Sequence, residues 1–525
     1  MLALGVWLAL VVALVSWVVP LGTPAAIAFG VAAPLLWITG LRSLALWSRA
    51  RAAASRAATV ASTVSPVSPA SLRVALLYCV ADDLDLAAIS ASGDQDLAVD
   101  VVVLDDSHEA ATREAVDAAA AANGWTVVRR TDRRGFKAGN LNHGLSVLRG
   151  RHDAYVLCDS DVVLPGDFVR RSLPALTDPT VAVVQGLPTA RPGATWFSRY
   201  FGALLRTHVS VTRAGREASG VVTLLGRGAL VRAAALHDVG GVPETVAEDL
   251  ALTVALRRRG WRLVNIDLEF AEDYPVDYRS FRTQLRKTTE GAVEFLRLHV
   301  RGRRQRRMRG IPVGEARDLV FEAALVPLTA LAGAVALIAG TVLAAAGTFP
   351  PLWAGLVSGL AAAAPLLPEA IRRIRVRGLA AGMVFVGVGS ALYASTMYVV
   401  LAAVLRVLLG RRAVFWITPK RAAGRDQVWA MLRAEVVLVP VLAAAAMLCS
   451  GAAAAAIAPV GALALALAFA APAVVGVRRP EKTAGSAVAG VTPVPSPRTS
   501  APPLPADSVA PRSRLLRPAG VGPRA

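Results

Sequence analysis

Cysteine is scarce in this chain, which has three in 525 residues. Cys79, Cys158 and Cys449 each lie in or beside an apolar run, and their spacing fits neither a zinc site nor a disulfide framework. The sequence therefore argues against a disulfide-stapled secreted domain and against a cysteine-based zinc protein. Scattered, unpaired cysteines are what a cytoplasmic domain is expected to have.

Acidic residues are outnumbered, with 37 Asp and Glu against 57 Lys and Arg and a formal net charge of +20. Nucleic-acid binding would be one reason for such an excess. The basic clusters, however, border long apolar segments, which favours anionic membrane lipids over nucleic acid as the partner. The tail 478–525 is basic and rich in Pro, Ser and Ala, a composition typical of a disordered segment.

The first apolar segment lacks a basic n-region and a cleavage site, so we interpret Met1–Pro20 as a retained helix rather than a signal peptide. Ala25–Trp47 is a second apolar run, and residues 1–48 therefore predict two transmembrane helices. Arginines in the linker 49–71 place that side in the cytoplasm by the positive-inside rule. We expect a multi-pass protein of the plasma membrane with a cytoplasmic soluble domain.

A second membrane region is predicted at 319–477, after a basic interfacial segment at 301–318. The segment 379–409 is long enough to cross, but arginines flank both of its ends, which favours a helix lying in the interface. Six spans are expected in total, with seven as the alternative. The predicted spans lack the paired charges that mark an ion path, which argues against a transporter. The spans of this region are predicted at 319–346, 350–370, 428–449 and 452–476.

Residues 72–300 lack such long apolar runs and predict a soluble domain. Short apolar runs alternate with helical patterns such as 109–124, whose Gly124 suits a helix C-terminus. This alternation predicts an α/β fold with a mostly parallel sheet, helices on both faces, and ligands beyond the carboxyl ends of the strands. The predicted strands are Val74–Val80, Val99–Leu104, Trp125–Val128, Ala154–Cys158 and Thr180–Val184.

Acidic residues follow two of these strands. Asp105 and Asp106 come after the second strand, and Asp159 and Asp161 come after the fourth. Two carboxylates at positions i and i+2 can share a hard divalent cation, Mg²⁺ or Mn²⁺, which would neutralise a departing diphosphate. A solvated loop is the alternative for an isolated Asp-x-Asp.

Two further stretches carry charge near predicted helix starts. Lys137 follows Gly135 where a helix is expected to begin, and a cation beside free backbone N–H groups can hold phosphate. Thr245 and Glu248 have the spacing of a capping box, which predicts that Glu248 caps the following helix. Asp249, in the first helical turn, is a candidate general base.

Seven short motifs occur along the chain: LDDS (104–107), GFKAGN (135–140), DSD (159–161), VQG (184–186), TVAED (245–249), QLRK (284–287) and FWITPK (415–420). As a set, within a membrane frame, they resemble the membrane-embedded synthases of glycosyltransferase family 2, such as the cellulose, hyaluronan and mannan/glucan synthases. The resemblance covers roughly residues 70–425. It implies a Rossmann-like GT-A domain of the α/β class inserted in an α-helical transmembrane bundle, with a gating-like loop at 412–425.

The resemblance also implies an inverting hexosyltransferase that uses a nucleotide sugar, in the first place a UDP-sugar, and a divalent cation. Asp249 would deprotonate the acceptor hydroxyl. The nucleotide sugar would be bound by Asp82, Asp106, Lys137 and Asp159, and the metal by Asp159 and Asp161. The acceptor and the diphosphate would contact Gln185, Glu248, Gln284 and Lys287.

The chain departs from the family pattern in two places. Lys287 and Thr288 stand where the family has Arg-Trp, so the ring that would stack on the acceptor sugar is missing. After the first strand, Asp82 and Asp83 replace an ending like Pro-x-Tyr-Asn-Glu. Three functions stay open: a synthase of a β-linked polysaccharide, an enzyme that adds one or a few sugars to a lipid or short glycan acceptor, and an inactive nucleotide-sugar-binding scaffold. The sugar, the linkage and the oligomeric state stay open too.

Overall fold

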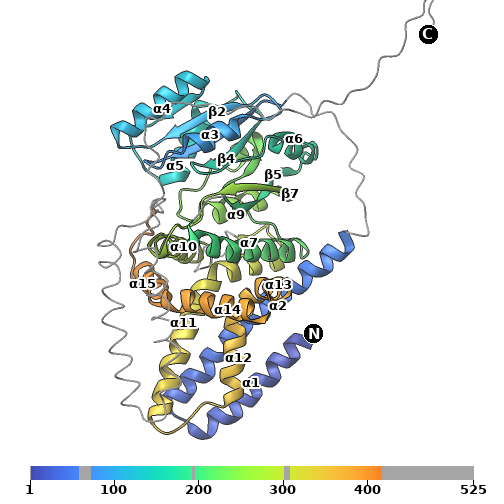
Figure 1. Cartoon of the computed structure of the whole chain (residues 1–525), viewed down its shortest axis with the longest axis vertical. Coiled ribbons are helices and arrows are strands. Elements are labelled where there is room, and N and C mark those ends of the chain that lie inside the picture. The colour runs from blue at the N-terminus through green and yellow to red at the C-terminus, as the bar shows by residue number, and fades with distance from the viewer. Residues whose placement is uncertain (1, 58–71, 192–194, 301–307, 417–525) are drawn as a thin grey trace, which may run out of the picture. The chain divides into compact units, whose positions relative to one another are not determined.

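The computed structural model describes residues 2–57, 72–191, 195–300 and 308–416 (Figure 1). The predicted spans at 428–449 and 452–476, the tail, and most of the gating-like loop lie outside the described residues.

The soluble region is built on a seven-stranded sheet with the order β3-β2-β1-β4-β6-β5-β7. Strands β3, β2, β1 and β4 are parallel, β6 is antiparallel to both of its neighbours, and β7 is parallel to β5. The five predicted strands and the mostly parallel sheet are confirmed, and β6 and β7 are additional to the prediction. The bounds are β1 Val74–Val80, β2 Asp100–Asp105, β3 Thr126–Arg129, β4 Ala154–Asp159, β5 Val181–Ala190, β6 Ala229–Arg232 and β7 Arg262–Glu272.

Alternate residues of β1 pack into the two layers of helices that cover the sheet. Val74, Leu76 and Tyr78 belong to the core that includes side chains of α3, α4 and α6, whereas Ala75 and Leu77 belong to the core with α5, α8 and α9. Because both faces are covered, β1 is a continuous apolar run, as is typical of buried parallel strands. The helix bounds are α3 Leu86–Gly93, α4 Ala110–Asn123, α5 Phe136–Val147, α6 Phe168–Ser172, α8 Ala233–Asp238 and α9 Glu248–Arg258.

Glycines end or begin two predicted helices as expected. Gly124 follows α4 with a left-handed φ of 70°, and its N–H bonds to the Ala120 carbonyl. Gly135 precedes α5 with a φ of 71°, which places Lys137 in the first turn of that helix. A side chain at Gly135 would also collide with Glu244, whose Cδ lies 2.6 Å from the position of a Cβ.

The predicted capping box is wrong. Ala247 is the residue before α9, no side chain caps that helix, and the Thr245 hydroxyl has no partner among the described residues. The Glu248 carboxylate lies 3.7 Å from the ammonium group of Lys137 on α5. Glu248 therefore contacts a residue that is distant in the sequence and does not cap its own helix, as the local pattern predicts it would.

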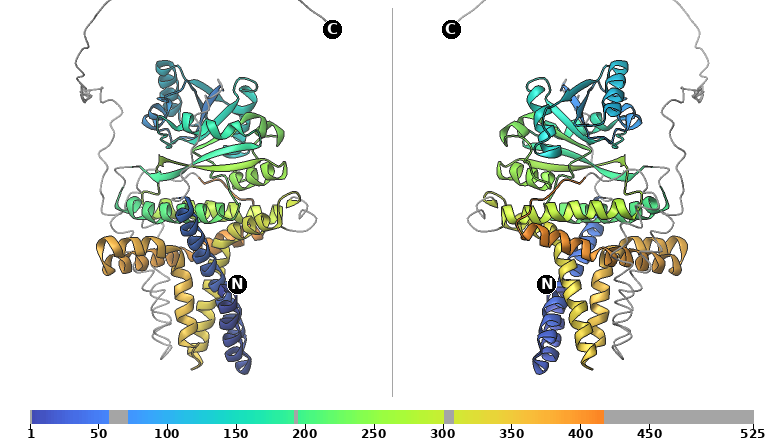
Figure 2. Two further views of the ribbon diagram at one scale, coloured as in Figure 1. Left: turned by 90° about the vertical axis from the view of Figure 1, so that its right-hand side faces the viewer. Right: turned by 90° about the vertical axis from the view of Figure 1, so that its left-hand side faces the viewer.

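Two long amphipathic helices, α7 (Trp196–Glu217) and α10 (Tyr278–His299), lie between the sheet and the apolar helices (Figures 1 and 2). Phe201 of α7 and Phe281 of α10 share a core with Leu392 of α14 and Val400 of α15. These two helices therefore lie in contact with the apolar helices and connect them to the sheet domain.

Four helical segments of the described chain are long and apolar enough to cross a membrane. They coincide with the first four predicted spans and indicate a membrane protein. The segments are α1 (Leu2–Leu21), α2 (Pro24–Ala57), α11 (Val313–Ala345) and residues 352–377, which comprise α12 (Leu352–Ala363), a 3₁₀ turn (Ala364–Leu366) and α13 (Leu367–Arg377).

The predicted single helix 379–409 is two helices, α14 (Leu379–Ser395) and α15 (Met397–Leu408). Each is shorter than the four candidate spans. Figure 2 shows α14 and α15 running across the direction of α11 and α12. This arrangement is consistent with the predicted interfacial placement, which remains a prediction.

Candidate active site

A cavity of about 860 Å³ lies where β1, β2 and β4 end and continues to α7 and α11. The parallel register brings Cys79 beside Asp159 and Val80 beside Asp105, so the acids after these strands meet at one edge of the sheet. All predicted site residues except Asp82 line this cavity. They are Asp106, Lys137, Asp159, Asp161, Gln185, Glu248, Asp249, Gln284 and Lys287.

Lys137 makes the central polar contacts of the cavity. Its ammonium group lies 2.7 Å from Asp159 Oδ1 and 3.7 Å from Glu248 Oε1, and it donates to the Gly226 carbonyl at 2.9 Å. Burial alone would raise the pKa of Asp159, but the charges of Lys137 and Arg227 outweigh it and hold that pKa well below its usual range. Asp159 is therefore an anion at neutral pH.

Glu248 and Asp249 are adjacent acids at the N-terminus of α9. Burial raises the pKa of Glu248 to about 7, and the Asp249 charge adds to this rise while Lys137 opposes it. Burial also raises the pKa of Asp249, against the Leu250 N–H group and the charge of Lys137. A carboxylate with a raised pKa is a stronger base than an ordinary one, so this pair suits proton abstraction from a hydroxyl.

Asp106 is held by Arg130, which donates to its two oxygens at 2.8 and 2.6 Å in a nearly buried bidentate pair. Asp82 does not reach the cavity. It has a left-handed φ of 63°, and its Oδ1 accepts the N–H groups of His108 and Glu109 at 2.7 and 2.9 Å. The adjacent Asp83 lines the cavity instead.

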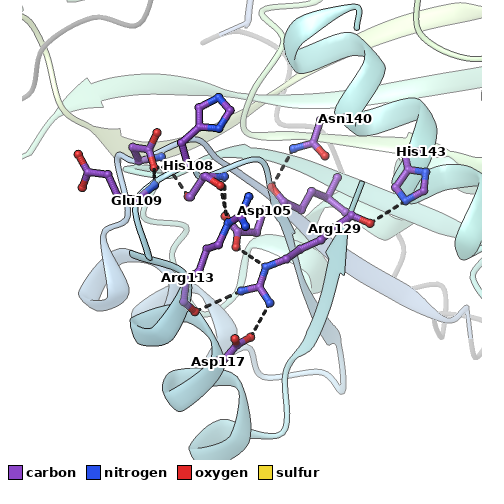
Figure 3. A network of polar contacts seen from close by, with 11 residues as sticks. Asp105, His108, Glu109, Arg113, Asp117, Arg129, Asn140 and His143 are labelled. Carbon is purple, nitrogen blue, oxygen red and sulfur yellow. Dashed lines mark hydrogen bonds and ion pairs between the residues drawn. The ribbon is translucent and has the colours of Figure 1, made fainter. Parts of the chain in front are cut away.

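Asp105 belongs to a separate network beside the cavity (Figure 3). Arg129 donates to Asp105 at 2.7 Å and to Asp117 at 2.8 Å. From α5, Asn140 donates to the Leu104 carbonyl at 2.8 Å. These contacts tie β2, α4, β3 and α5 together, so the network fixes the strand end that carries the next residue, Asp106.

The two glutamines predicted to contact the acceptor or the diphosphate differ in whether their side chains already have hydrogen-bond partners. Gln185 donates to the Thr223 carbonyl at 2.7 Å and to Asn265 at 2.9 Å, and it accepts the Leu225 N–H at 3.0 Å. Its amide is thus engaged in shaping the loop before β6. The buried Oε1 of Gln284 has no hydrogen-bond partner among the described residues, which leaves it open to a ligand.

Within the motif 284–287, Lys287 is the cation that lines the cavity. Arg286 instead donates from its Nε to Glu290 Oε1 at 2.9 Å. Burial lowers the pKa of Lys287, and the described residues place no carboxylate within ion-pair distance of it. Its ammonium group lies 4.5 Å from the ring centre of Phe415, and that ring stacks on Phe136 with centroids 6.1 Å apart. Thr288 lines the cavity where the family pattern has an aromatic ring.

Sequence reasoning missed a second ion pair in the cavity, formed by Arg227 and Glu272. Arg227 Nη2 donates to Glu272 Oε1 at 2.7 Å, and its Nε donates to the other oxygen. Burial raises the pKa of Glu272 although Arg227 opposes the rise. Glu272 ends an alternating apolar-polar run at 262–272, as the other acids end their strands, and this signal could have found it. Arg227 lies in a loop without a recognisable pattern.

Acidic residues outnumber basic residues in the lining of the cavity. Its lining has nine Asp or Glu residues and six Lys or Arg residues, so negative charge is in excess. Among the described residues no group of three or more acids, histidines or cysteines could hold a metal alone. Asp159 and Asp161 both line the cavity, and their role as metal ligands stays a prediction. Mg²⁺ is commonly bound by one or two carboxylates together with phosphate oxygens.

Residues 155–448, more than half of the chain, match the family model described as "Glycosyl transferase family group 2". The chain belongs to this family. It is therefore a glycosyltransferase, and the resemblance inferred from the seven motifs is confirmed.

The chain is also similar to curated proteins from plants and bacteria. Over 208 residues the chain is 30% identical to glucomannan 4-beta-mannosyltransferase 2 of Arabidopsis thaliana, covering 38% of this chain and 39% of the relative. It is 27% identical over 146 residues to the glucans biosynthesis glucosyltransferase H of Xylella fastidiosa, covering 25% and 23%. It is 32% identical over 149 residues to the beta-monoglucosyldiacylglycerol synthase of Synechocystis, covering 27% and 31%. The matched region thus spans less than two-fifths of the length of these proteins.

Among solved structures, the mannosyltransferase PcManGT of Pyrobaculum calidifontis, in complex with GDP-Man and Mn²⁺, is similar with a TM-score of 0.50. The similarity covers 73% of this chain and 99% of PcManGT at 21% identity. At this identity the likeness concerns the fold. The expected GT-A architecture of the family is thereby confirmed for this chain.

Proposed function

We propose that this glycosyltransferase transfers a hexosyl group from a nucleotide sugar, with inversion, to a growing β-linked polysaccharide at a membrane. The observation that carries the proposal is one cavity that holds Asp249 and Glu248, both with raised pKa, beside the Lys137–Asp159 pair. A relative named as a glucomannan 4-beta-mannosyltransferase supports the β linkage, and one named for glucan biosynthesis supports a polysaccharide product.

Asp249 is the proposed general base. Within the described part of the chain its side chain accepts the Leu250 N–H at 2.7 Å and pairs with no cation, whereas Glu248 lies close to Lys137. In the proposed step Asp249 takes the proton of the acceptor hydroxyl, whose oxygen bonds to the anomeric carbon as the bond to the diphosphate breaks. A single displacement of this kind inverts the anomeric configuration.

Cationic side chains of the cavity would bind the departing nucleoside diphosphate. Lys287 has no carboxylate partner among the described residues and is free to contact a phosphate oxygen. Lys137 would exchange part of its contact with Asp159 for the donor. Asp159 and Asp161 would hold a divalent cation, which supplies neutralisation of the diphosphate charge when bound. Asp106, beside Arg130, is proposed to contact the base of the nucleotide.

The predicted donor is a UDP-sugar, and GDP-mannose is the second candidate because PcManGT was solved with GDP-Man. Transfer to a lipid or short glycan is the second candidate function. Thr288 favours it, because no ring at that position holds a lengthening acceptor, and so does the name of the Synechocystis relative. For either function we propose a plasma-membrane protein with a cytoplasmic active site.

The test uses the full chain in nanodiscs with Mg²⁺ or Mn²⁺, offered UDP-glucose, UDP-N-acetylglucosamine and GDP-mannose in parallel. We expect metal-dependent nucleotide release and a long product, with loss of both after chelation. Asp249→Asn is expected to lower the rate at least about a hundredfold, because the amide cannot accept the proton. The control is Glu114→Gln, which also changes a carboxylate to an amide but lies on the exposed side of α4.

Product size separates the candidates. A single-sugar or lipid-linked product would refute polymer synthesis and support the second candidate function, transfer to a lipid or short glycan. Full activity of Asp249→Asn would refute the assignment of the base. If the wild-type chain releases no nucleotide from any of the three donors, transfer from these nucleotide sugars is contradicted and the inactive scaffold is favoured.

A further inference from the structure

Helix α10 forms part of the cavity wall, and Gln284, Lys287 and Thr288 are among its residues that line the cavity. Its only two acidic residues follow directly, one helical turn apart, at Glu290 and Glu294. Neither lines the cavity. Each accepts a backbone N–H from a different loop, and each of these loops carries residues of the cavity.

Glu290 is completely buried and holds the segment that follows α15. Its Oε2 accepts the N–H of Val414 at 3.1 Å. Its Oε1 accepts from Arg286 at 2.9 Å and lies 3.5 Å from Arg406 Nε. A buried carboxylate held by two cationic neighbours is fixed in place, so it is a firm anchor for a single N–H group.

The residue after this anchor is Phe415, which lines the cavity. Its ring stacks on Phe136, one residue before Lys137, and also lies 4.5 Å from the ammonium group of Lys287. Glu290 thus binds the residue next to an aromatic ring that contacts α5 near Lys137.

Glu294 holds a second loop. Its Oε2 accepts the N–H of Val246 at 3.1 Å, two residues before Glu248 and three before Asp249. Gly291 permits this approach, because a Cβ at that position would lie 3.2 Å from the Ala247 nitrogen and 3.2 Å from the Val246 side chain. The proposed base therefore begins its helix from a loop that rests on α10.

We propose that Glu290 and Glu294 are positioning residues that set two loops against the cation-bearing face of α10. Glu290 places the Phe415 segment at the donor end, and Glu294 places the loop that leads to Asp249. This inference rests on the proposed function, because it assigns the donor to the Lys137 end and the base to Asp249.

The two carboxylates are expected to affect different kinetic constants. Loss of Glu290 frees a segment that contacts the donor end, so it should weaken donor binding and raise KM. Loss of Glu294 shifts the base relative to the acceptor, so it should lower kcat with little change in the donor KM. A merely structural role would lower the amount of folded protein and would not divide the effects in this way.

The kinetic test compares Glu290→Ala, Glu290→Gln, Glu294→Ala and Glu294→Gln in the full chain, with donor KM and kcat measured by nucleotide release. We expect about a tenfold rise in KM for Glu290→Ala and about a tenfold fall in kcat for Glu294→Ala, from the loss of one hydrogen bond to a charged acceptor. Each Gln variant keeps an oxygen for the N–H and should recover most of the loss. Each position serves as the matched control for the other, since both are acids on one helix.

Hydrogen–deuterium exchange of the same proteins gives a readout that needs no activity. The peptide containing Val414 should exchange faster in Glu290→Ala alone, and the peptide containing Val246 faster in Glu294→Ala alone. Active variants whose KM and kcat change together, or exchange that is unchanged in both peptides, would overturn the inference. An inactive wild-type chain would count against the proposed function, and exchange would then still decide whether these carboxylates hold the loops.

Discussion

Lys137 acts on three carboxylates at once. Its charge helps to lower the pKa of Asp159, and it opposes the rise in the pKa of Glu248 and Asp249 that burial causes. A general base must be ionised to accept a proton. Lys137 therefore extends toward lower pH the range in which Asp249 is able to work, in addition to any contact with the donor.

Replacing Lys137 by Met keeps the length of the side chain and removes its charge. The pKa values of Glu248 and Asp249 then rise further, and the acid limb of the pH–rate profile should move up by about one pH unit. The sign follows from the base, because activity falls as the pH drops through its pKa and that pKa is now higher. Nucleotide release measured across the pH range checks this shift.

The matched control is Arg149→Met, which removes an exposed positive charge just beyond the end of α5. Its acid limb should stay in place. If Lys137→Met slows the reaction at every pH equally, Lys137 serves the donor alone and its influence on the base is refuted.

Single residues also show how far the sequence predicts the site. Acids after β2 and β4 can be found because strand ends are readable and parallel strands end at one edge. Glu248 is misassigned because the capping pattern is local, whereas its partner Lys137 stands 111 positions earlier in the chain, the difference of their residue numbers. Arg227 escapes because a loop cation without a motif has no periodic signal.

At the scale of elements, α7 crosses α2 in close backbone contact. A Cβ at Gly215 would lie 2.4 Å from the Leu46 carbonyl oxygen. Beside this crossing, Arg216 of α7 donates to Asp318 of α11 at 2.6 Å, and Arg42 of α2 donates to the same carboxylate at 2.9 Å. Helix α7, which lines the cavity, is thus in contact with two candidate spans, α2 and α11.

Gly215→Val is expected to force α7 and α2 apart, because backbone atoms cannot move aside as a flexible side chain can. Overpacking of this kind costs about 1–3 kcal/mol. We expect a lower melting temperature in detergent and a lower yield of folded protein. Gly314→Val is the control, since nothing lies within 4 Å of a Cβ at that position of α11. Equal stability of the two variants would show that the crossing tolerates a side chain.

Elements differ in how well the sequence predicts them. The strands β1 to β5 are found because buried parallel strands are continuous apolar runs with clear ends. The short strand β6 is absent from the prediction, since four residues give too little periodicity. The break between α14 and α15 at Thr396 interrupts an apolar run that composition alone shows as one piece.

At the scale of the whole molecule, the sheet lies at one end of the candidate spans. The turns after α1 and after α11 lie at the opposite end (Figures 1 and 2). The 20 residues of α1 would extend about 30 Å at 1.5 Å per residue, which is close to the thickness of the hydrocarbon core. Arg49 and Arg51, near the end of α2, then fall on the side that the positive-inside rule assigns to the cytoplasm.

This topology predicts which positions a membrane-impermeant maleimide reaches in intact cells. Thr23→Cys, beside the first turn, and Thr348→Cys, in the second, are expected to react from outside, because both turns lie beyond the far ends of the spans. Glu114→Cys, on the exposed side of α4, should react only after the cells are permeabilised. The wild-type chain gives the background of its own cysteines, of which Cys158 is buried and Cys79 half-buried. Labelling of Glu114→Cys in intact cells, with both turns protected, would place the active site outside and remove its access to cytoplasmic nucleotide sugars.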